Sequence, residues 1–299
     1  MTMLRANATA LLEPGIRKVV NTAFDFRRRD EQFSKIFNIL TSQMRNEEDR
    51  TFSGLGTMFE KDEGEAVAYD DPIQGFRKVY THVTYALGFR VTMEMLDDEL
   101  YGQMNKMSRS LAISSVNANE VVSADVLNNA FAAGSAGPDG VALCSTAHPR
   151  LDGGTNSNRL AVDSDLSESS LETAITLLED TVDDRNIPLG LKAKTLVVQH
   201  TNKFTARRLL NSQLQAETAN NAINAFKDES LNSLIWQYLT DTDAWFLLAD
   251  SHELNYFWRM RPVLESDKDF DSGDSKFKMT QRFSVGFTDW RGLVGTPGA

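Results

Sequence analysis

Apolar and polar side chains alternate along residues 76–92, which is the clearest pattern in the chain. The odd positions carry the apolar side chains of Val79, Val83, Tyr85, Leu87, Phe89 and Val91. A period of two predicts a β-strand with one face on a core. A strand of about fifteen residues would extend about 50 Å, whereas strands average about five or six residues. We therefore expect a long β-hairpin that projects from the subunit. The alternative is a strand that bends between two sheets at Gly88.

The segment before this strand, from Glu47 to Asp71, is the least core-like part of the chain. It contains three glycines, an acidic run at 61–65 and four scattered apolar side chains, Phe52, Met58, Phe59 and Tyr69. Exposed hairpins with unpaired edges associate unless a partner covers them. We expect these four side chains to contact a neighbouring subunit.

Helical spacing dominates the segments on either side. In residues 1–46, Phe33, Ile36, Phe37 and Leu40 form a one-sided stripe after the basic run 27–29, which predicts an amphipathic helix in an N-terminal arm. This helix could dock on a neighbouring subunit through Arg27, Arg28, Phe33 and Phe37, or pack on its own domain; the pattern favours neither. From 93 to 131, a Met- and Leu-rich stripe predicts a long helix, or a pair with a break near 117–119.

Helix and strand patterns alternate from residue 160 to residue 249. Ser169 and Glu172 have the spacing of a capping box before a helix, and 195–198 and 244–249 are short apolar runs typical of buried strands. A second helix is expected from 201 or 202 to 210. Two further strands, 254–263 and 276–288, flank an acidic loop at 265–274. These patterns predict a mixture of helices and strands.

Charge and cysteine content restrict the possible functions. The 299 residues include 42 acidic and 31 basic side chains, a formal net charge of −11, which disfavours sequence-specific binding to nucleic acid. The single cysteine, Cys144, cannot form an intrachain disulfide. The sequence has no secretion signal and no run of about 20 apolar residues, so we expect a soluble cytoplasmic protein.

The chain shows no convincing catalytic, cofactor or metal motif. Phosphate loops, zinc-binding His pairs and nucleophile elbows are missing from the sequence. Cys144 and His148 are four residues apart, so a Cys/His nucleophilic pair is the one enzymatic hypothesis. Asp267, Asp269 and Asp271 have the alternate spacing of a Ca²⁺ loop but lack its closing glutamate. The sequence therefore predicts no enzyme and no cofactor.

The C-terminal segment resembles a known family. Residues 287–298 read FTDWRGLVGTPG, which is similar to the tail of tailed-bacteriophage major capsid proteins with the HK97-like fold. His148-Pro149 followed by residues 153–158, GGTNSN, is similar to a segment of Mu-like major head subunits. The resemblance implies an HK97-like α+β fold with an N-terminal arm (1–46), an extended loop and long β-hairpin (47–92), a peripheral domain with a spine helix (93–140), an axial domain (141–252) and a return to the peripheral domain with a C-terminal tail (253–299).

The same resemblance implies a function and a set of partners. The protein would be a major capsid protein that assembles into pentamers and hexamers of an icosahedral head around double-stranded DNA, which it would contact non-specifically. Expected partners are a scaffold protein, a portal, and a maturation protease or decoration proteins, with no membrane. Its location would be the virion capsid, assembled in the host bacterial cytoplasm. The alternatives are an encapsulin-type compartment shell that encloses cargo and, less favoured, a Cys/His hydrolase.

Overall fold

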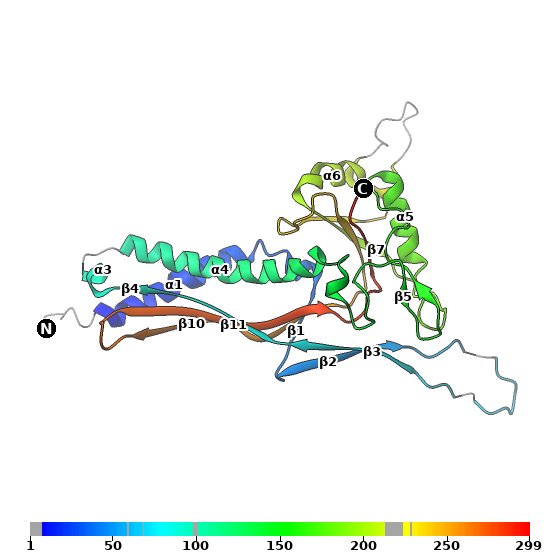
Figure 1. The fold of residues 1–299 in the computed structure, drawn as a ribbon, viewed down its shortest axis with the longest axis horizontal. Coiled ribbons are helices and arrows are strands. Elements are labelled where there is room, and N and C mark those ends of the chain that lie inside the picture. The colour runs from blue at the N-terminus through cyan, green and yellow to red at the C-terminus, as the bar shows by residue number, and fades with distance from the viewer. Residues whose placement is uncertain (1–7, 59, 68, 98–100, 213–223, 228) are drawn as a thin grey trace. The chain divides into compact units, whose positions relative to one another are not determined.

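The computed structural model describes residues 8–58, 60–67, 69–97, 101–212, 224–227 and 229–299. The chain forms two compact units (Figure 1). Unit 1 comprises 1–46, 81–123 and 256–285, and unit 2 comprises 47–80, 124–255 and 286–299. The chain therefore alternates between the two units.

Unit 1 is built on a four-stranded sheet in the order β1-β10-β11-β4. Its strands are β1 (Asn38–Thr41), β10 (Leu254–Lys268), β11 (Ser275–Phe287) and β4 (Val83–Val91). β11 and β4 are antiparallel, with Phe277 opposite Phe89 and the two rings stacked 5.2 Å apart. The period-two patterns produce this sheet because they place every second side chain on the core face.

Helices cover the core face of this sheet (Figure 1). They are α1 (Ala8–Arg28), the short α3 (Met93–Asp97) and the long α4 (Tyr101–Asn128). Ile16 and Val20 of α1 and Met104 and Leu111 of α4 are buried in one cluster with Phe277. Met104 and Leu111 of the expected stripe therefore pack in the core, whereas Met107 is exposed.

The strand expected at 76–92 is two strands. β3 (Ile73–Thr81) pairs with β2 (Asn46–Ser53) in a separate two-stranded sheet, and β4 joins the sheet of unit 1. The division falls at His82, whose buried ring bonds the hydroxyls of Ser42 at 2.9 Å and Ser284 at 3.0 Å. The alternative of a strand shared by two sheets therefore holds, but the break is at His82 and not at Gly88, which lies inside β4.

One helix prediction needs correction. The stripe that begins at Phe33 forms only one helical turn, α2 (Phe33–Ile36), and the chain then continues as the edge strand β1, because it pairs with β10. Of the two alternatives for residues 93–131, there is no break near 117–119, since α4 is continuous from Tyr101 to Asn128. Residues 98–100, which include part of the expected helix start, lie outside the described residues.

Unit 2 contains a second four-stranded sheet, in the order β12-β9-β7-β8. Its strands are β12 (Leu293–Thr296), β9 (Trp245–Ala249), β7 (Ala193–Val198) and β8 (Asn232–Ile235). Two helices, α5 (Glu168–Glu179) and α6 (Lys203–Asn211), share one buried cluster with this sheet. The capping box of α5 is formed by Ser167 and Ser170, two residues before the expected pair Ser169 and Glu172.

Short elements complete unit 2. β5 (His148–Pro149) and β6 (Thr155–Asn156) form a small antiparallel hairpin, which is the segment 148–158 singled out in the sequence. Among the described residues of this unit, 3₁₀ turns lie at Ala133–Ser135, His200–Asn202 and Ala225–Lys227. Residues 286–299 belong to this unit, where β12 pairs with β9. In unit 1, β10 extends to Lys268, which shortens the acidic loop to 269–274.

Candidate interaction surfaces and the buried tail cluster

The C-terminal segment runs through the interior of unit 2. Trp290 is 5% exposed, and its indole stacks on the imidazole of His148 with ring centroids 4.4 Å apart. The guanidinium of Arg291 lies 4.9 Å from the same indole. We call Trp290, His148, Arg291 and their hydrogen-bonding partners the tail cluster.

His148 is held at both ring nitrogens. Nδ1 lies 2.6 Å from a carboxylate oxygen of Asp139, and Nε2 lies 3.0 Å from Oδ1 of Asn158. The amide of Asn158 is oriented by two backbone groups, because its Oδ1 accepts from Ser145 N and its Nδ2 donates to Leu143 O. Nε2 of His148 must therefore carry a proton and donate it to Asn158.

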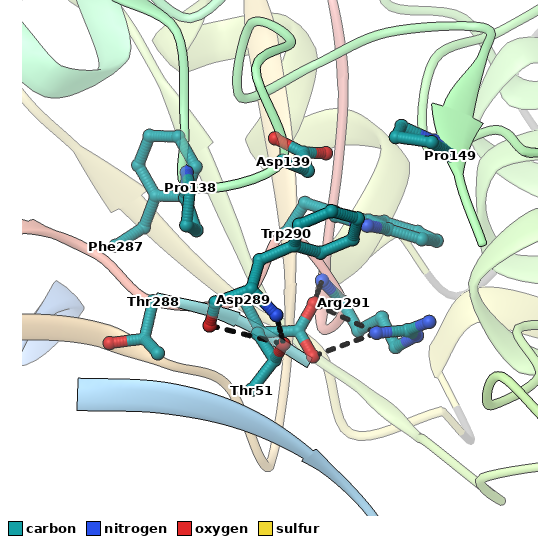
Figure 2. A pocket seen from close by; sticks show the side chains of 10 residues that line it. Thr51, Pro138, Asp139, Pro149, Phe287, Thr288, Asp289, Trp290 and Arg291 are labelled. Carbon is teal, nitrogen blue, oxygen red and sulfur yellow. Dashed lines mark hydrogen bonds and ion pairs between the residues drawn. The ribbon is translucent and has the colours of Figure 1, made fainter. Parts of the chain in front are cut away.

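Arg291 joins three parts of unit 2. Its guanidinium contacts Asp289 at 2.9 Å and Asp184 at 2.9 Å, and its Nε donates to the carbonyl of Val182 at 3.3 Å. Figure 2 shows the pair of Asp289 and Arg291 beside Trp290. Two carboxylates around one largely buried guanidinium satisfy its forked donors, which fixes the turn after β11 against the loop that follows α5.

Thr288 forms a second polar contact between distant segments. Its hydroxyl donates to Asp49 at 2.7 Å, lies 2.8 Å from the hydroxyl of Tyr80, and accepts from Asn255 Nδ2 at 3.3 Å. Burial raises the pKa of Tyr80, so this phenol stays protonated and serves as a donor. The contact ties β2, β3 and the tail together inside unit 2.

The cavity beside this cluster is too small for a substrate. It has a volume of about 10 Å³, close to the space of one water molecule. Figure 2 shows the side chains that line it, which are Thr51, Phe76, Pro138, Asp139, Pro149, Phe287, Thr288, Asp289, Trp290 and Arg291. The buried polar groups form hydrogen bonds and ion pairs with one another, as expected for a cluster that stabilises the fold.

The hypothesis of a Cys/His nucleophile does not fit this geometry. Cys144 is 1% exposed, and burial raises the pKa of its thiol, which disfavours the reactive thiolate. Both ring nitrogens of His148 are bonded to oxygen atoms of Asp139 and Asn158 and so do not act as a base for a thiol. The hydrolase alternative has no support in these two residues.

The expected contact residues of the extended loop are exposed. The connection between β2 and β3 runs from 54 to 72, and Phe52, Met58 and Tyr69 are 65%, 101% and 97% exposed. Phe59 lies outside the described residues. Arg185 anchors the end of the loop through an ion pair with Asp70 and a 2.6 Å hydrogen bond to the carbonyl of Asp71.

The four expected contact residues of the N-terminal arm separate into two groups. Phe33 and Phe37 are 2% and 3% exposed and pack inside unit 1, where Phe33 contacts the ring of Tyr256 at 4.9 Å. Both rings are thus covered by their own subunit. Arg27 and Arg28 lie in the last turn of α1, and Arg28 is within 3.8 Å of Glu31.

Neither a metal cluster nor a membrane span is found in the described part of the chain. No group of three or more Asp, Glu, His or Cys side chains among these residues could hold a metal ion. In the acidic loop, Asp269 pairs with Lys276 at 2.5 Å. None of the described helices is both long and apolar enough to cross a bilayer.

Sequence reasoning missed the partners of the tail cluster. The tail, His148 and the segment that ends at Asn158 stood out, but the contacts of the tail cluster with Asp139 and Asp184 did not. Asp139 was visible only as part of a Gly-Pro-Asp-Gly turn, and Asp184 lies 107 residues from Arg291. Local spacing carries no signal for such contacts.

A family model described as "phage capsid protein" matches residues 76–295. Among curated proteins, none matches this chain. Similar solved structures include the capsid of a native GTA particle (TM-score 0.56, 11% identity, 89% of each chain covered) and the capsid of the cyanophage P-SCSP1u (TM-score 0.55, 10% identity, 90% of this chain and 88% of that chain). The virus-like particle from Pyrococcus furiosus is also similar (TM-score 0.53, 10% identity, 94% and 97% covered).

Proposed function

This chain belongs to the phage capsid protein family, and we propose that its copies associate into the icosahedral shell of a tailed-bacteriophage head. It is a structural major capsid protein, and its fold is the HK97-like α+β fold. We further propose that the shell is built from pentamers and hexamers. In each ring, one surface of a copy would contact a different surface of the next copy. Such a contact between unlike surfaces generates a closed ring when the rotation from one copy to the next divides a full turn evenly.

The observation that carries this proposal, beside the family, is the exposure of the described apolar side chains in the loop 54–72. Met58 and Tyr69 project from this loop with almost no contact to their own subunit. Large apolar side chains that are so exposed mark interaction sites when they gather in one segment. Phe52, Met58 and Tyr69 therefore remain proposed contacts with a neighbouring copy, as do Phe59, Arg27 and Arg28 by sequence.

We infer the remaining partners from the family. They are a scaffold protein, a portal, a maturation protease or decoration proteins, and packaged double-stranded DNA bound without sequence preference. The formal net charge of −11 supports the last point, because an acidic wall does not adhere strongly to phosphates. Assembly would take place in the host bacterial cytoplasm. Unit 1 would correspond to the peripheral domain, and unit 2 would contain the axial domain.

Two loop variants test the proposal by electron microscopy of the purified protein. In one, residues 57–68 are replaced by a short Gly-Ser linker. In the other, the length is kept and Met58 and Tyr69 are changed to Ser. We expect both variants to remain folded by circular dichroism and to form few closed shells, whereas the unaltered chain forms them. Both variants retain Thr51, which anchors β3 through a 2.7 Å hydrogen bond from Phe76 N.

The outcomes are distinct. Normal shells from both variants would overturn the role of the loop. A monomeric unaltered chain, alone and co-expressed with its neighbouring reading frames, would overturn the assembly proposal itself. DNA inside co-expressed particles would separate a phage head from a cargo compartment.

A further inference from the structure

Charge is segregated along the part of the chain that forms the second sheet. Residues 160–184 contain no Lys or Arg and eight acidic residues, which are Asp163, Asp165, Glu168, Glu172, Glu179, Asp180, Asp183 and Asp184. Residues 190–212 contain no Asp or Glu and five basic residues, which are Lys192, Lys194, Lys203, Arg207 and Arg208. α5 lies in the acidic segment and α6 in the basic one.

The fold places these two helices at opposite ends of one sheet. α5 packs on β12, β9 and β7, and α6 packs on β7 and β8. The strand order is β12-β9-β7-β8, and both helices cover the same face, since Leu171, Leu178, Ala206 and Leu210 share one buried cluster (Figure 1). This sheet therefore has an acidic helix toward its β12 end and a basic helix toward its β8 end.

Four charged side chains of these two helices face solvent. Glu172 and Glu179 of α5 are exposed, and so are Arg207 and Arg208 of α6. Within the described residues none of these four takes part in a salt bridge, although Arg208 has a 3.5 Å hydrogen bond to Thr205. Charges left unneutralised inside the subunit are available to a partner of the opposite sign.

An aromatic side chain accompanies the basic residues. Phe204 is 69% exposed, with the Lys203 ammonium 5.8 Å from its ring centre. Phe204, Arg207, Arg208, Asn211 and Ser212 line an open hollow on α6. Aromatic and arginine side chains are the residue types that most often contribute strongly to binding at protein interfaces.

We propose that the acidic face of α5 in one copy contacts the basic face of α6 in the next copy around each ring. This inference rests on the proposed assembly function and names the surfaces that meet in it. The partner is a second copy because both complementary surfaces occur on the same chain, at opposite ends of one sheet. Such a contact joins unlike surfaces, so each copy offers one of each to its two neighbours and the contact repeats around a closed ring. Electrostatic complementarity would then set which edges pair.

Charge reversal at each edge tests the contact. Glu172→Lys with Glu179→Lys reverses the acidic edge and raises the formal net charge by four, from −11 to −7. Arg207→Glu with Arg208→Glu reverses the basic edge and lowers it by four, to −15. The variant with all four changes returns to −11, with the two edges exchanged in sign. All four positions are solvent-exposed on helices, so folding should persist and is checked by circular dichroism.

We expect each two-residue variant to need at least about tenfold more protein for ring or shell formation, because like charges then face each other. The four-residue variant should assemble like the unaltered chain. Electron microscopy and sedimentation velocity over a concentration series give the readout. Increasing salt should weaken assembly of the unaltered chain and of the four-residue variant alike.

The design separates edge pairing from net charge. If self-repulsion alone governed association, the variant at −7 would assemble better than the unaltered chain. That result would overturn the inference, and so would assembly of either two-residue variant at the normal concentration. A folded four-residue variant that fails to assemble would also overturn it. In each of these cases the unaltered chain still forms shells, so the proposed function stands. Only failure of the unaltered chain to assemble would contradict that function.

Discussion

The imidazole of His148 lies almost parallel to the indole of Trp290, with their centroids 4.4 Å apart and their planes 13° apart. The contact joins a two-residue strand to a segment more than 140 residues later in the chain. Because Asp139 and Asn158 hold both ring nitrogens, the imidazole cannot rotate away without losing two buried hydrogen bonds. The tail therefore fixes the interior of unit 2.

Removal of the indole should be among the most damaging single changes. We expect Trp290→Ala to lower the free energy of unfolding by about 3–5 kcal/mol, the usual cost of deleting a large buried aromatic side chain. Phe270→Ala is the matched control, since Phe270 is 98% exposed and its loss should change stability by less than about 0.5 kcal/mol. Urea unfolding of the unassembled subunit measures both. Equal effects would show that the tail cluster is not part of the core.

Gly292 is required by both its conformation and its surroundings. Its φ is +88°, and a Cβ there would lie 2.4 Å from the carbonyl oxygen of Ser251. We expect Gly292→Ala to lower the free energy of unfolding by more than about 2 kcal/mol, because the destabilising effects of backbone strain and of a steric clash add together. Gly140→Ala isolates the first contribution, since Gly140 has φ of +82° and open space around it. A thermal unfolding midpoint no lower for Gly292→Ala than for Gly140→Ala would contradict the steric argument.

Glu31 should make the stability of unit 1 depend on pH. Its carboxyl is 8% exposed, and burial, opposed by Arg28 and Arg261 and reinforced by Glu120, raises its pKa from 4.5 to about 7. Between these values the folded state binds more protons than the unfolded chain. The contribution of the Glu31 carboxyl to the free energy of unfolding is therefore fully present below about pH 4.5, and it is lost as the pH rises through 7.

A comparison with Glu31→Gln isolates this effect, because the amide does not titrate. The difference in free energy of unfolding between the two proteins should change by about 2–3 kcal/mol from pH 5 to pH 8. The unaltered chain should become less stable relative to the variant as the pH rises. Chemical unfolding at several pH values gives the difference. Glu172→Gln, at an exposed position, is the control. A pH-independent difference for Glu31→Gln would show that the carboxyl titrates normally.

Cys144 should be unreactive in the native protein. The side chain is buried, and burial raises the pKa of its thiol. A thiol-specific reagent at neutral pH should leave it unmodified in the native state and react with one equivalent after denaturation. Rapid modification of the Cys144 thiol in the native protein would instead support a nucleophilic role for this residue.

Elements with a clear apolar pattern were predictable from the sequence. β10, β11 and α4 lie near their expected positions because alternate or helically spaced apolar side chains predict them, and β7 and β9 do so because they are short apolar runs. The division of the strand at His82 was not predictable in the same way. The hydroxyls that hold His82 belong to Ser42 and Ser284, which are 40 and 202 residues away. The one-turn α2 was mistaken for a longer helix because its apolar stripe also fits a turn that leads into an edge strand.

The candidate surfaces show the same limit. Exposure of the loop that carries Met58 and Tyr69 followed from its composition, whereas burial of Phe33 and Phe37 did not, since the same residues suit a core or an interface. The tail motif indicated the family, but only the fold shows that Arg291 bridges Asp184 and Asp289. The charge difference between α5 and α6 is visible in the sequence, and its meaning depends on their places at opposite ends of one sheet.

The alternation of the chain between its two units has a consequence for protein synthesis. Unit 1 needs β11, and the sheet of unit 2 needs β12, so neither can be completed until residues near 290 have left the ribosome. Domains made of contiguous sequence fold one after another during translation, at about 5–20 residues per second. Here neither unit can mature before its last strand has emerged, so the two units mature at nearly the same time. A nascent chain that has emerged only as far as β10 therefore cannot present a finished surface to its neighbours.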